Sequence, residues 1–257
     1  RRIIAVKIKS IKAIAVNLSP NPKTQPRVEL DANGGYFVNP MDRYKYDIKY
    51  RSSTNWNRVA CVVTAEDGTW GLGTTIHSGP VVSIINDHFS ELLVDQNPMA
   101  TEKLWDMMRR SSSPYGTAGV ASYAISALDN AIWDLKGKLL EKPVYELLGG
   151  PVKDDIFCYA SNTMLRYKTS DYMDWFLELG FKAVKVFLRH GPDEGLAGLN
   201  KNVEIVANTR EQIGPDIELA VDSWMSSNIE YAVRVSEALK PYNIKWLEDY
   251  MLPEDMD

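Results

Sequence analysis

The pattern of apolar and polar positions changes its period near residue 80. Residues 3–16 alternate loosely, and 59–76 forms two alternating runs around Asp67-Gly68, a dipeptide typical of a tight hairpin turn. From 82 to 148 the apolar positions recur every three or four residues, as they do in amphipathic helices. The pattern therefore predicts a small antiparallel sheet followed by a set of helices.

One of these helices, expected from about 120 to 139, carries small residues on its apolar face. Ala124, Ala127 and Ala131 all fall on that face. Short side chains let a helix approach its neighbour closely. We therefore expect this helix to pack tightly against another element.

The run Gly149-Gly150-Pro151 ends the helical region, and we expect a domain boundary there, between 1–150 and 151–257. Beyond it, apolar runs and helical patterns alternate strictly. Repeated βα units form either an open doubly wound sheet or a closed eight-stranded barrel. The sequence contains neither a GxGxxG fingerprint after the first strand nor a P-loop, which favours the barrel. The expected strands are 156–161, 183–188, 217–222 and 244–248, and the expected helices are 172–179, 203–213 and 229–239.

Four strands are half of such a barrel. A complete one needs about 250 residues. We therefore expect the chain to be a fragment, or a protein whose other half is missing, with the fold class α/β: an N-terminal α+β domain and the first half of a TIM-like barrel.

A long polar segment, 19–57, interrupts the β region. It contains four prolines, Gly34-Gly35 and several tyrosines. Loops of this length are usually either disordered or functional, and the aromatic content favours a lid or binding loop.

Two acidic residues, Asp222 and Glu248, end consecutive expected strands. Because the carboxyl ends of parallel barrel strands meet at one face, we expect these carboxylates to point at a common spot, where a hard divalent cation could bind. Strand-end acids also serve as helix caps and loop ion pairs, so the pattern alone leaves both interpretations open. Lys185 lies in the same layer, with Arg189 just beyond it. Such positive groups beside a cation suit a carboxylate substrate whose charge grows in the transition state.

Composition narrows the class of protein. The chain is 45% hydrophobic and 25% charged, with a net charge of −5 and no basic block, so we expect neither a nucleic-acid partner nor an anionic membrane partner. No long apolar run predicts a signal peptide or a membrane span. Cys61 and Cys158 form no CxxC pair, and we expect them to be buried in a cytoplasmic protein. Among the histidines, His77 and His190 lie near loops that could face a site, whereas His88 lies in a helix.

Several longer motifs occur along the chain: Ala127-Leu-Asp-Asn-Ala-Ile-Trp-Asp, Pro143-Val-Tyr-Glu-Leu-Leu-Gly-Gly150, Gly180-Phe-Lys-Ala-Val-Lys185, Ala220-Val-Asp222 and Trp246-Leu-Glu248. Together they resemble the enolase superfamily, mandelate racemase subgroup. The runs His190-Gly-Pro-Asp-Glu-Gly, Asp222-Ser-Trp-Met-Ser and Pro241-Tyr-Asn-Ile-Lys-Trp246 are similar to its branch of acid-sugar dehydratases of the L-rhamnonate type.

The resemblance implies an α+β capping domain on a modified (β/α)7β barrel, with Mg²⁺ held by three strand-end carboxylates. Asp222 and Glu248 match the first two ligands, and the third would lie beyond Asp257. The implied reaction removes the α-proton of a sugar acid, an aldonate, through an enediolate, and loss of the 3-hydroxyl gives a 2-keto-3-deoxy acid. Lys185 matches the first lysine of a KxK pair whose second position is Phe187 here. The implied base is a His–Asp dyad on later strands.

The resemblance also implies substrate contacts from the capping-domain loop. Arg51, Asn33 and Tyr36 are the candidates there, and Arg189 joins them from the barrel. A histidine expected early in that loop has no counterpart, which leaves the sugar acid open. The implied partners are a small-molecule sugar acid and further copies of the chain, in a dimer to an octamer. A racemase or cycloisomerase of the same superfamily, or an inactive truncated module, are the alternatives.

Overall fold

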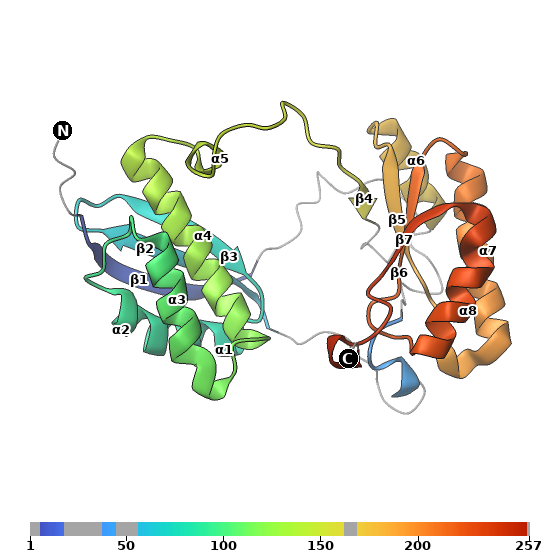
Figure 1. The fold of residues 1–257 in the computed structure, drawn as a ribbon, viewed down its shortest axis with the longest axis horizontal. Coiled ribbons are helices and arrows are strands. Elements are labelled where there is room, and N and C mark those ends of the chain that lie inside the picture. The colour runs from blue at the N-terminus through green and yellow to red at the C-terminus, as the bar shows by residue number, and fades with distance from the viewer. Residues whose placement is uncertain (1–5, 18–37, 45–55, 162–168, 256–257) are drawn as a thin grey trace. The chain divides into compact units, whose positions relative to one another are not determined.

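The structure, a computed structural model, describes residues 6–17, 38–44, 56–161 and 169–255. Its described residues form two compact units (Figure 1). The first contains 6–17 and 56–154, and the second contains 38–44 together with the described part of 155–255.

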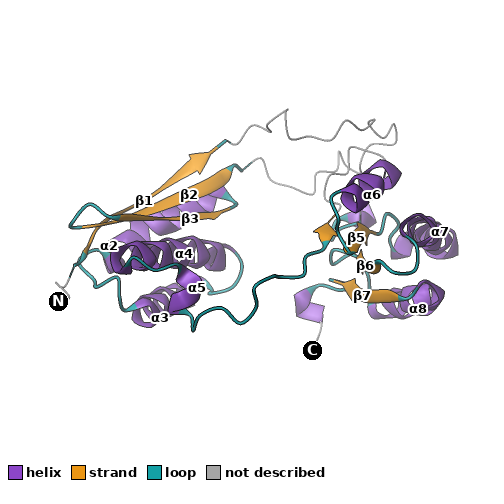
Figure 2. Ribbon diagram, turned by 90° about the horizontal axis from the view of Figure 1, so that it is seen from above, coloured by secondary structure: helices purple, strands orange, loops and turns teal. Residues whose placement is uncertain are grey.

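The first unit is a three-stranded antiparallel sheet with helices on one face (Figure 2). The strands β1, β2 and β3 pair in sequence order, and the turn between the last two falls at Asp67-Gly68, as predicted. A π-helical segment, Ile84–Phe89, joins the first two helices. The bounds are β1 Ile8–Val16, β2 Arg58–Ala65, β3 Trp70–Thr75, α1 Ser78–Ser83, α2 Ser90–Leu93, α3 Thr101–Ser112, α4 Val120–Leu140 and α5 Val144–Leu147.

Helix α4 lies directly on β3, which confirms the predicted close packing. Two glycines of β3 face the helix. A Cβ on Gly73 would lie 1.9 Å from the carbonyl oxygen of Ala127, and one on Gly71 would lie 2.0 Å from that of Ala131. No side chain fits at either position, so the backbone of β3 contacts the backbone of α4 directly.

The second unit is a four-stranded parallel sheet in the order β4-β5-β6-β7, with three helices on one side (Figure 2). This is the arrangement of the first βα units of a barrel, and the predicted fold class is confirmed. Helix α7 begins at Gly195 rather than near 203, and its first turns contain Gly195 and Gly198, a residue type that is a poor helix former. The bounds are β4 Ala160–Ser161, β5 Ala183–Phe187, β6 Glu218–Asp222, β7 Ile244–Glu248, α6 Thr169–Glu178, α7 Gly195–Ile213 and α8 Ile229–Leu239.

Residues 38–44, which fall within the long polar segment 19–57, belong to the second unit and pack against the loop after β5. The backbone N–H of Val38 donates to the carbonyl oxygen of Leu188 at 3.1 Å. The carboxylate of Asp42, which is 4% exposed, fills the space beside Gly191, where a Cβ would lie 2.0 Å from its Oδ2. This part of the segment is therefore held by the loop that follows β5.

The expectation that both cysteines are buried holds for one of them. Both cysteines are free, but only Cys61 is buried, and the prediction for Cys158 is wrong. Cys158 precedes the two-residue strand β4 in an extended stretch that packs little against the unit.

Among the described helices, none combines the length and the apolar character that crossing a bilayer requires.

Candidate metal centre

Parallel pairing brings three predicted residues to one point. Phe187 pairs with Asp222, and Asp222 pairs with Glu248, so β5, β6 and β7 end at the same level. The ammonium Nζ of Lys185 lies 2.9 Å from Asp222 Oδ2 and 2.5 Å from Glu248 Oε1. The side chains of Lys185 and Asp222 are 7% and 6% exposed. The structure thus places the buried ammonium of Lys185 between two strand-end carboxylates.

Further hydrogen bonds fix the two carboxylates. Asp222 Oδ1 accepts from the backbone N–H of Trp224 at 2.8 Å, and Glu248 Oε2 accepts from the indole Nε1 of Trp246 at 2.8 Å. Aromatic rings surround the ammonium: Lys185 Nζ is 5.6 Å from the ring centroid of Tyr159 and 5.5 Å from that of Phe187. These rings add cation–π attraction and limit the access of water.

The surroundings shift the pKa of each charged group. Burial acts to lower the pKa of Lys185, but hydrogen bonds to Glu248 and Asp222 outweigh it, so the pKa is raised. Burial raises the pKa of Asp222, although Lys185 and the N–H of Trp224 oppose it. For Glu248 the effect of burial is exceeded by the donors Lys185 and Trp246, and its pKa is lowered. Lys185 is therefore held as an ammonium and Glu248 as a carboxylate.

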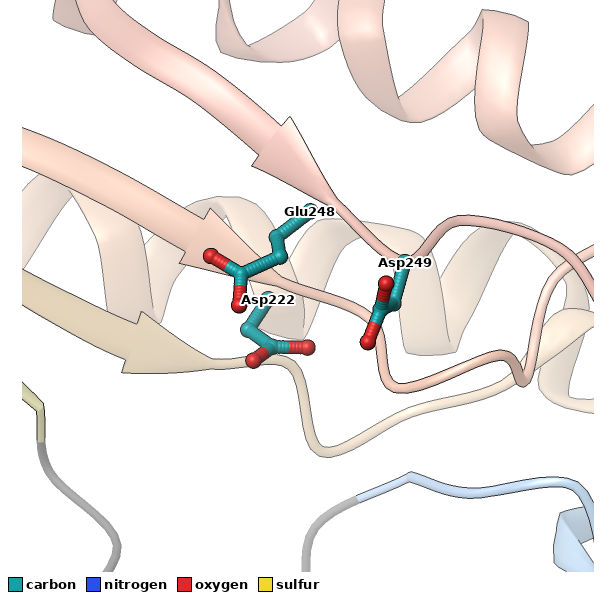
Figure 3. A group of neighbouring side chains, drawn as sticks. All are labelled: Asp222, Glu248 and Asp249. Atoms are coloured by element: carbon teal, nitrogen blue, oxygen red, sulfur yellow. The ribbon is translucent and has the colours of Figure 1, made fainter. Parts of the chain in front are cut away.

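A third carboxylate, Asp249, joins this pair (Figure 3). One oxygen from each of Asp222, Glu248 and Asp249 lies within 4.8 Å of the others. The sequence pattern did not identify Asp249, because neighbouring residues of a strand point to opposite faces. Asp249 has a φ of 47°, and Trp224 and Met225 also have positive φ, so the chain turns sharply after both strands. Such left-handed residues are uncommon outside glycine and cluster at functional sites.

The donor set fits a hard divalent cation. All three candidate ligands are carboxylates, and neither cysteine nor histidine takes part in the group. Carboxylate oxygen is the ligand type that Mg²⁺ and Ca²⁺ bind, whereas softer metals favour sulfur or imidazole. The residues present are therefore chemically suited to Mg²⁺.

The other predicted site residues are distributed differently. Arg189 lies in the loop just after β5, where its backbone N–H donates to Asn202 Oδ1 at 3.0 Å. Arg51, Asn33 and Tyr36 lie outside the described residues.

The histidines contribute no group to the carboxylate cluster. His190 also lies in the loop after β5, where its Nδ1 is 2.8 Å from Glu194 Oε2. His77 and His88 belong to the first unit. His77 packs edge-on against Tyr123, and His88 shares a hydrogen bond with the hydroxyl of Tyr115.

Two protein families match the chain. The family described as "Mandelate racemase / muconate lactonizing enzyme, N-terminal domain" matches residues 40–149, and "Enolase C-terminal domain-like" matches residues 170–257. The two matches lie one on either side of the predicted boundary at Gly149-Gly150.

Known proteins show the same relationship. The chain is 39% identical over 223 residues to L-rhamnonate dehydratase of Saccharopolyspora erythraea, covering 86% of this chain and 55% of that protein. The crystal structure of rhamnonate dehydratase from Gibberella zeae complexed with Mg is 29% identical, with a TM-score of 0.82, over 98% of this chain and 61% of that one. The 3,6-anhydro-D-galactonate cycloisomerase from Zobellia galactanivorans is 29% identical, with a TM-score of 0.70, over 97% and 60%. The chain spans about half the length of the curated relatives it matches.

The matches to both family domains, the shared fold and the strand-end carboxylates agree with one another. The chain therefore belongs to the mandelate racemase/muconate lactonizing enzyme family of the enolase superfamily.

Proposed function

We propose that the full-length protein is a Mg²⁺-dependent dehydratase that converts an aldonate of the L-rhamnonate type to a 2-keto-3-deoxy acid. The observation that carries this proposal is the buried contact of Lys185 with Asp222 and Glu248 at the ends of three neighbouring strands. The 39% identity to an L-rhamnonate dehydratase supports the substrate class.

Asp222 and Glu248 would hold the cation, with Asp249 beside them. When bound, Mg²⁺ would act as a Lewis acid that stabilises negative charge developing on the substrate carboxylate. The indole of Trp246 and the N–H of Trp224 orient the two ligands, each through a hydrogen bond of 2.8 Å. Such outer contacts hold metal-binding carboxylates in a fixed orientation.

Lys185 supplies fixed positive charge. Removal of the α-proton leaves an enediolate. The 3-hydroxyl then leaves as water after taking a proton from an acid that we place in the part of the relatives that this chain does not cover, and the resulting enol becomes the keto acid. The ammonium of Lys185, already hydrogen-bonded at the cluster, offsets charge in the first of these steps. Phe187 stands where a second lysine would supply a base, and a phenyl ring accepts no proton. We therefore assign proton removal to the His–Asp pair implied for later strands, in the part of the relatives that this chain does not cover.

The remaining assignments concern the substrate and the cellular setting. Arg189 would contact the anionic substrate from the barrel, and Arg51, Asn33 and Tyr36 would contact it from the capping-domain loop. The proposal includes a cytoplasmic location and assembly into a homo-oligomer, from dimer to octamer.

A cycloisomerase is the second candidate, because the Zobellia galactanivorans enzyme shares this fold and is 29% identical to the chain over the aligned 60% of its length. Both reactions begin with removal of an α-proton. They differ in the group that leaves C3, because the dehydratase releases the 3-hydroxyl as water, whereas a 3,6-anhydro acid would open its own C3–O bond and release none.

The test is a panel of aldonates given to the full-length protein with Mg²⁺, with detection of the keto acid. Asp222→Asn should abolish product formation. Glu218→Gln is the matched control, because Glu218 lies at the opposite end of the same strand and pairs with Lys245 at 2.8 Å. Conversion of a 3,6-anhydro aldonate, with no reaction of the open-chain aldonates, would favour the cycloisomerase, and exchange of the α-proton in deuterated water without keto acid would favour a racemase. Full activity in Asp222→Asn would refute the proposed site.

Metal binding can be measured separately from activity. Tb³⁺ binds oxygen ligands, and its emission can be excited through a nearby indole. The indole of Trp246 contacts Glu248 directly, so we expect Tb³⁺ emission that Mg²⁺ competes away. Asp222→Asn should weaken Tb³⁺ binding at least about tenfold, because loss of a group that merely orients a metal ligand already costs about 10- to 100-fold, whereas Glu218→Gln should not.

A further inference from the structure

The loop after β5 is held by a buried side chain from a helix behind the sheet. Asn202, on α7, is 1% exposed. Its Oδ1 accepts hydrogen bonds from the backbone N–H groups of Arg189 at 3.0 Å and His190 at 3.2 Å. Its Nδ2 donates to the carbonyl oxygen of His190 at 2.7 Å. One amide thus binds three backbone groups of two consecutive loop residues.

A second helix completes this arrangement. The hydroxyl of Tyr231, on α8, donates to the same carbonyl oxygen of His190 at 3.0 Å and accepts from Asn202 Nδ2 at 3.1 Å. The side-chain amide of Asn202 therefore uses both of its N–H donors and accepts twice at its oxygen, which is its full capacity. Tyr231 is 5% exposed, so these bonds form away from bulk water, where each is strengthened.

An asparagine is the side chain that this geometry requires. Aspartate would retain the two bonds to N–H groups but would turn a second acceptor toward the carbonyl oxygen of His190. Alanine would leave the N–H groups of Arg189 and His190 without the acceptor they have now. A buried backbone group that loses its hydrogen-bond partner destabilises the conformation that buried it. Because every bond ends on the backbone of two residues, the side chain determines the path of that part of the loop.

We propose that Asn202, together with Tyr231, is a positioning residue that orients Arg189 toward the anionic substrate. This inference rests on the proposed function for the part that concerns substrate, whereas the effect on the loop stands independently of it. Loss of Asn202 should move Arg189 without changing the cluster of Lys185 and Asp222, so it should act on KM more than on kcat.

The loop itself is tested by hydrogen exchange of the backbone amides. In Asn202→Ala, the amides of Arg189 and His190 should exchange at least about tenfold faster than in the unaltered protein, as expected when a buried hydrogen bond is lost. Thr209→Val is the control, because Thr209 is equally buried on α7 but bonds only within its own helix, to the carbonyl oxygen of Ile205 at 2.8 Å. Tyr231→Phe removes a single hydroxyl and should give a smaller effect of the same sign, which covers the case in which Asn202→Ala does not fold. Unchanged exchange at both amides would overturn the inference.

The link to substrate is tested in the full-length protein by a double-mutant cycle. Arg189→Gln and Asn202→Ala should each raise KM about tenfold, and the double variant should show no more than the larger single effect. Additive effects, or a loss of kcat alone, would show that Asn202 does not act through Arg189. If the unaltered protein dehydrates no sugar acid, the proposed function fails, and the exchange measurement still decides whether Asn202 positions the loop.

Discussion

Replacing Lys185 with methionine would test the electrostatics of the candidate metal centre. The change removes the ammonium and retains most of the side-chain volume. It leaves the buried carboxylate of Asp222, with a side chain 6% exposed, without a cation 2.9 Å away. It also leaves Asp222 beside a second carboxylate, that of Glu248. In the unaltered protein the ammonium of Lys185 pairs with both carboxylates and offsets their mutual repulsion.

The size of the effect follows from the burial of each pair. Removing one partner of a buried ion pair costs about 3–5 kcal/mol. The side chain of Glu248 is 29% exposed, so solvent can replace part of its interaction, and this second pair adds no more than about 1 kcal/mol. We therefore expect Lys185→Met to lower the free energy of unfolding by about 3–6 kcal/mol. The assay is urea unfolding at pH 7 with EDTA present, followed by tryptophan fluorescence.

Two variants serve as controls. Lys245→Met breaks an ion pair between β7 and β6 at the opposite end of the sheet, where Lys245 and Glu218 are 43% and 44% exposed, and should cost less than about 1 kcal/mol. The double variant Lys185→Met/Asp222→Asn removes both charges of the buried pair and should recover most of the lost stability. A loss below about 1 kcal/mol in Lys185→Met, or no recovery in the double variant, would refute the reasoning.

Three further predictions concern packing and thiol chemistry. Gly73→Ala should force α4 away from β3 and lower the free energy of unfolding, measured by urea titration, by about 1–3 kcal/mol. The control Thr74→Ala lies on the exposed face of the same strand and should change the free energy of unfolding by less than about 0.5 kcal/mol. Gly191→Ala should displace the carboxylate of Asp42 and speed amide exchange in residues 38–44; unchanged exchange there would contradict this packing. Cys158 should react with a disulfide reagent at pH 8 in the native chain, and Cys61 only after denaturation, because burial raises the pKa of the Cys61 thiol to about 12.

The parts of the fold that the sequence predicted best are those with clear local signals. Helix α8 has the predicted bounds because Asn228 caps it, accepting from the N–H of Tyr231 at 2.8 Å, and because Pro241 follows its end. Strand β7 was also predicted at its observed bounds. The start of α7 differs from the prediction because Gly195 and Gly198 disfavour helix by their intrinsic propensity, whereas packing of Leu199 into the core extends the helix over them.

The site was predictable where a residue type and a strand end coincide. Asp222 and Glu248 satisfied both conditions, and Lys185 followed from the strand register. Asp249 could not be predicted in this way, because its position depends on a left-handed backbone conformation. Such a conformation is expected from sequence mainly at glycine. The role of Asn202 could not be predicted for another reason. A polar residue in the middle of a helix is ordinarily expected at the surface, whereas Asn202 is buried.

The carboxylate cluster has a consequence for the order in which ligands bind. One ammonium, that of Lys185, faces the three carboxylates of Asp222, Glu248 and Asp249. Two negative charges therefore lack a counter-charge within the group, and a divalent cation balances them where a monovalent ion would not. Without that cation, an anionic sugar acid would approach a negative field and be repelled; with it, the field is neutral. Charge alone thus favours a sequence in which the metal binds first and the acid second.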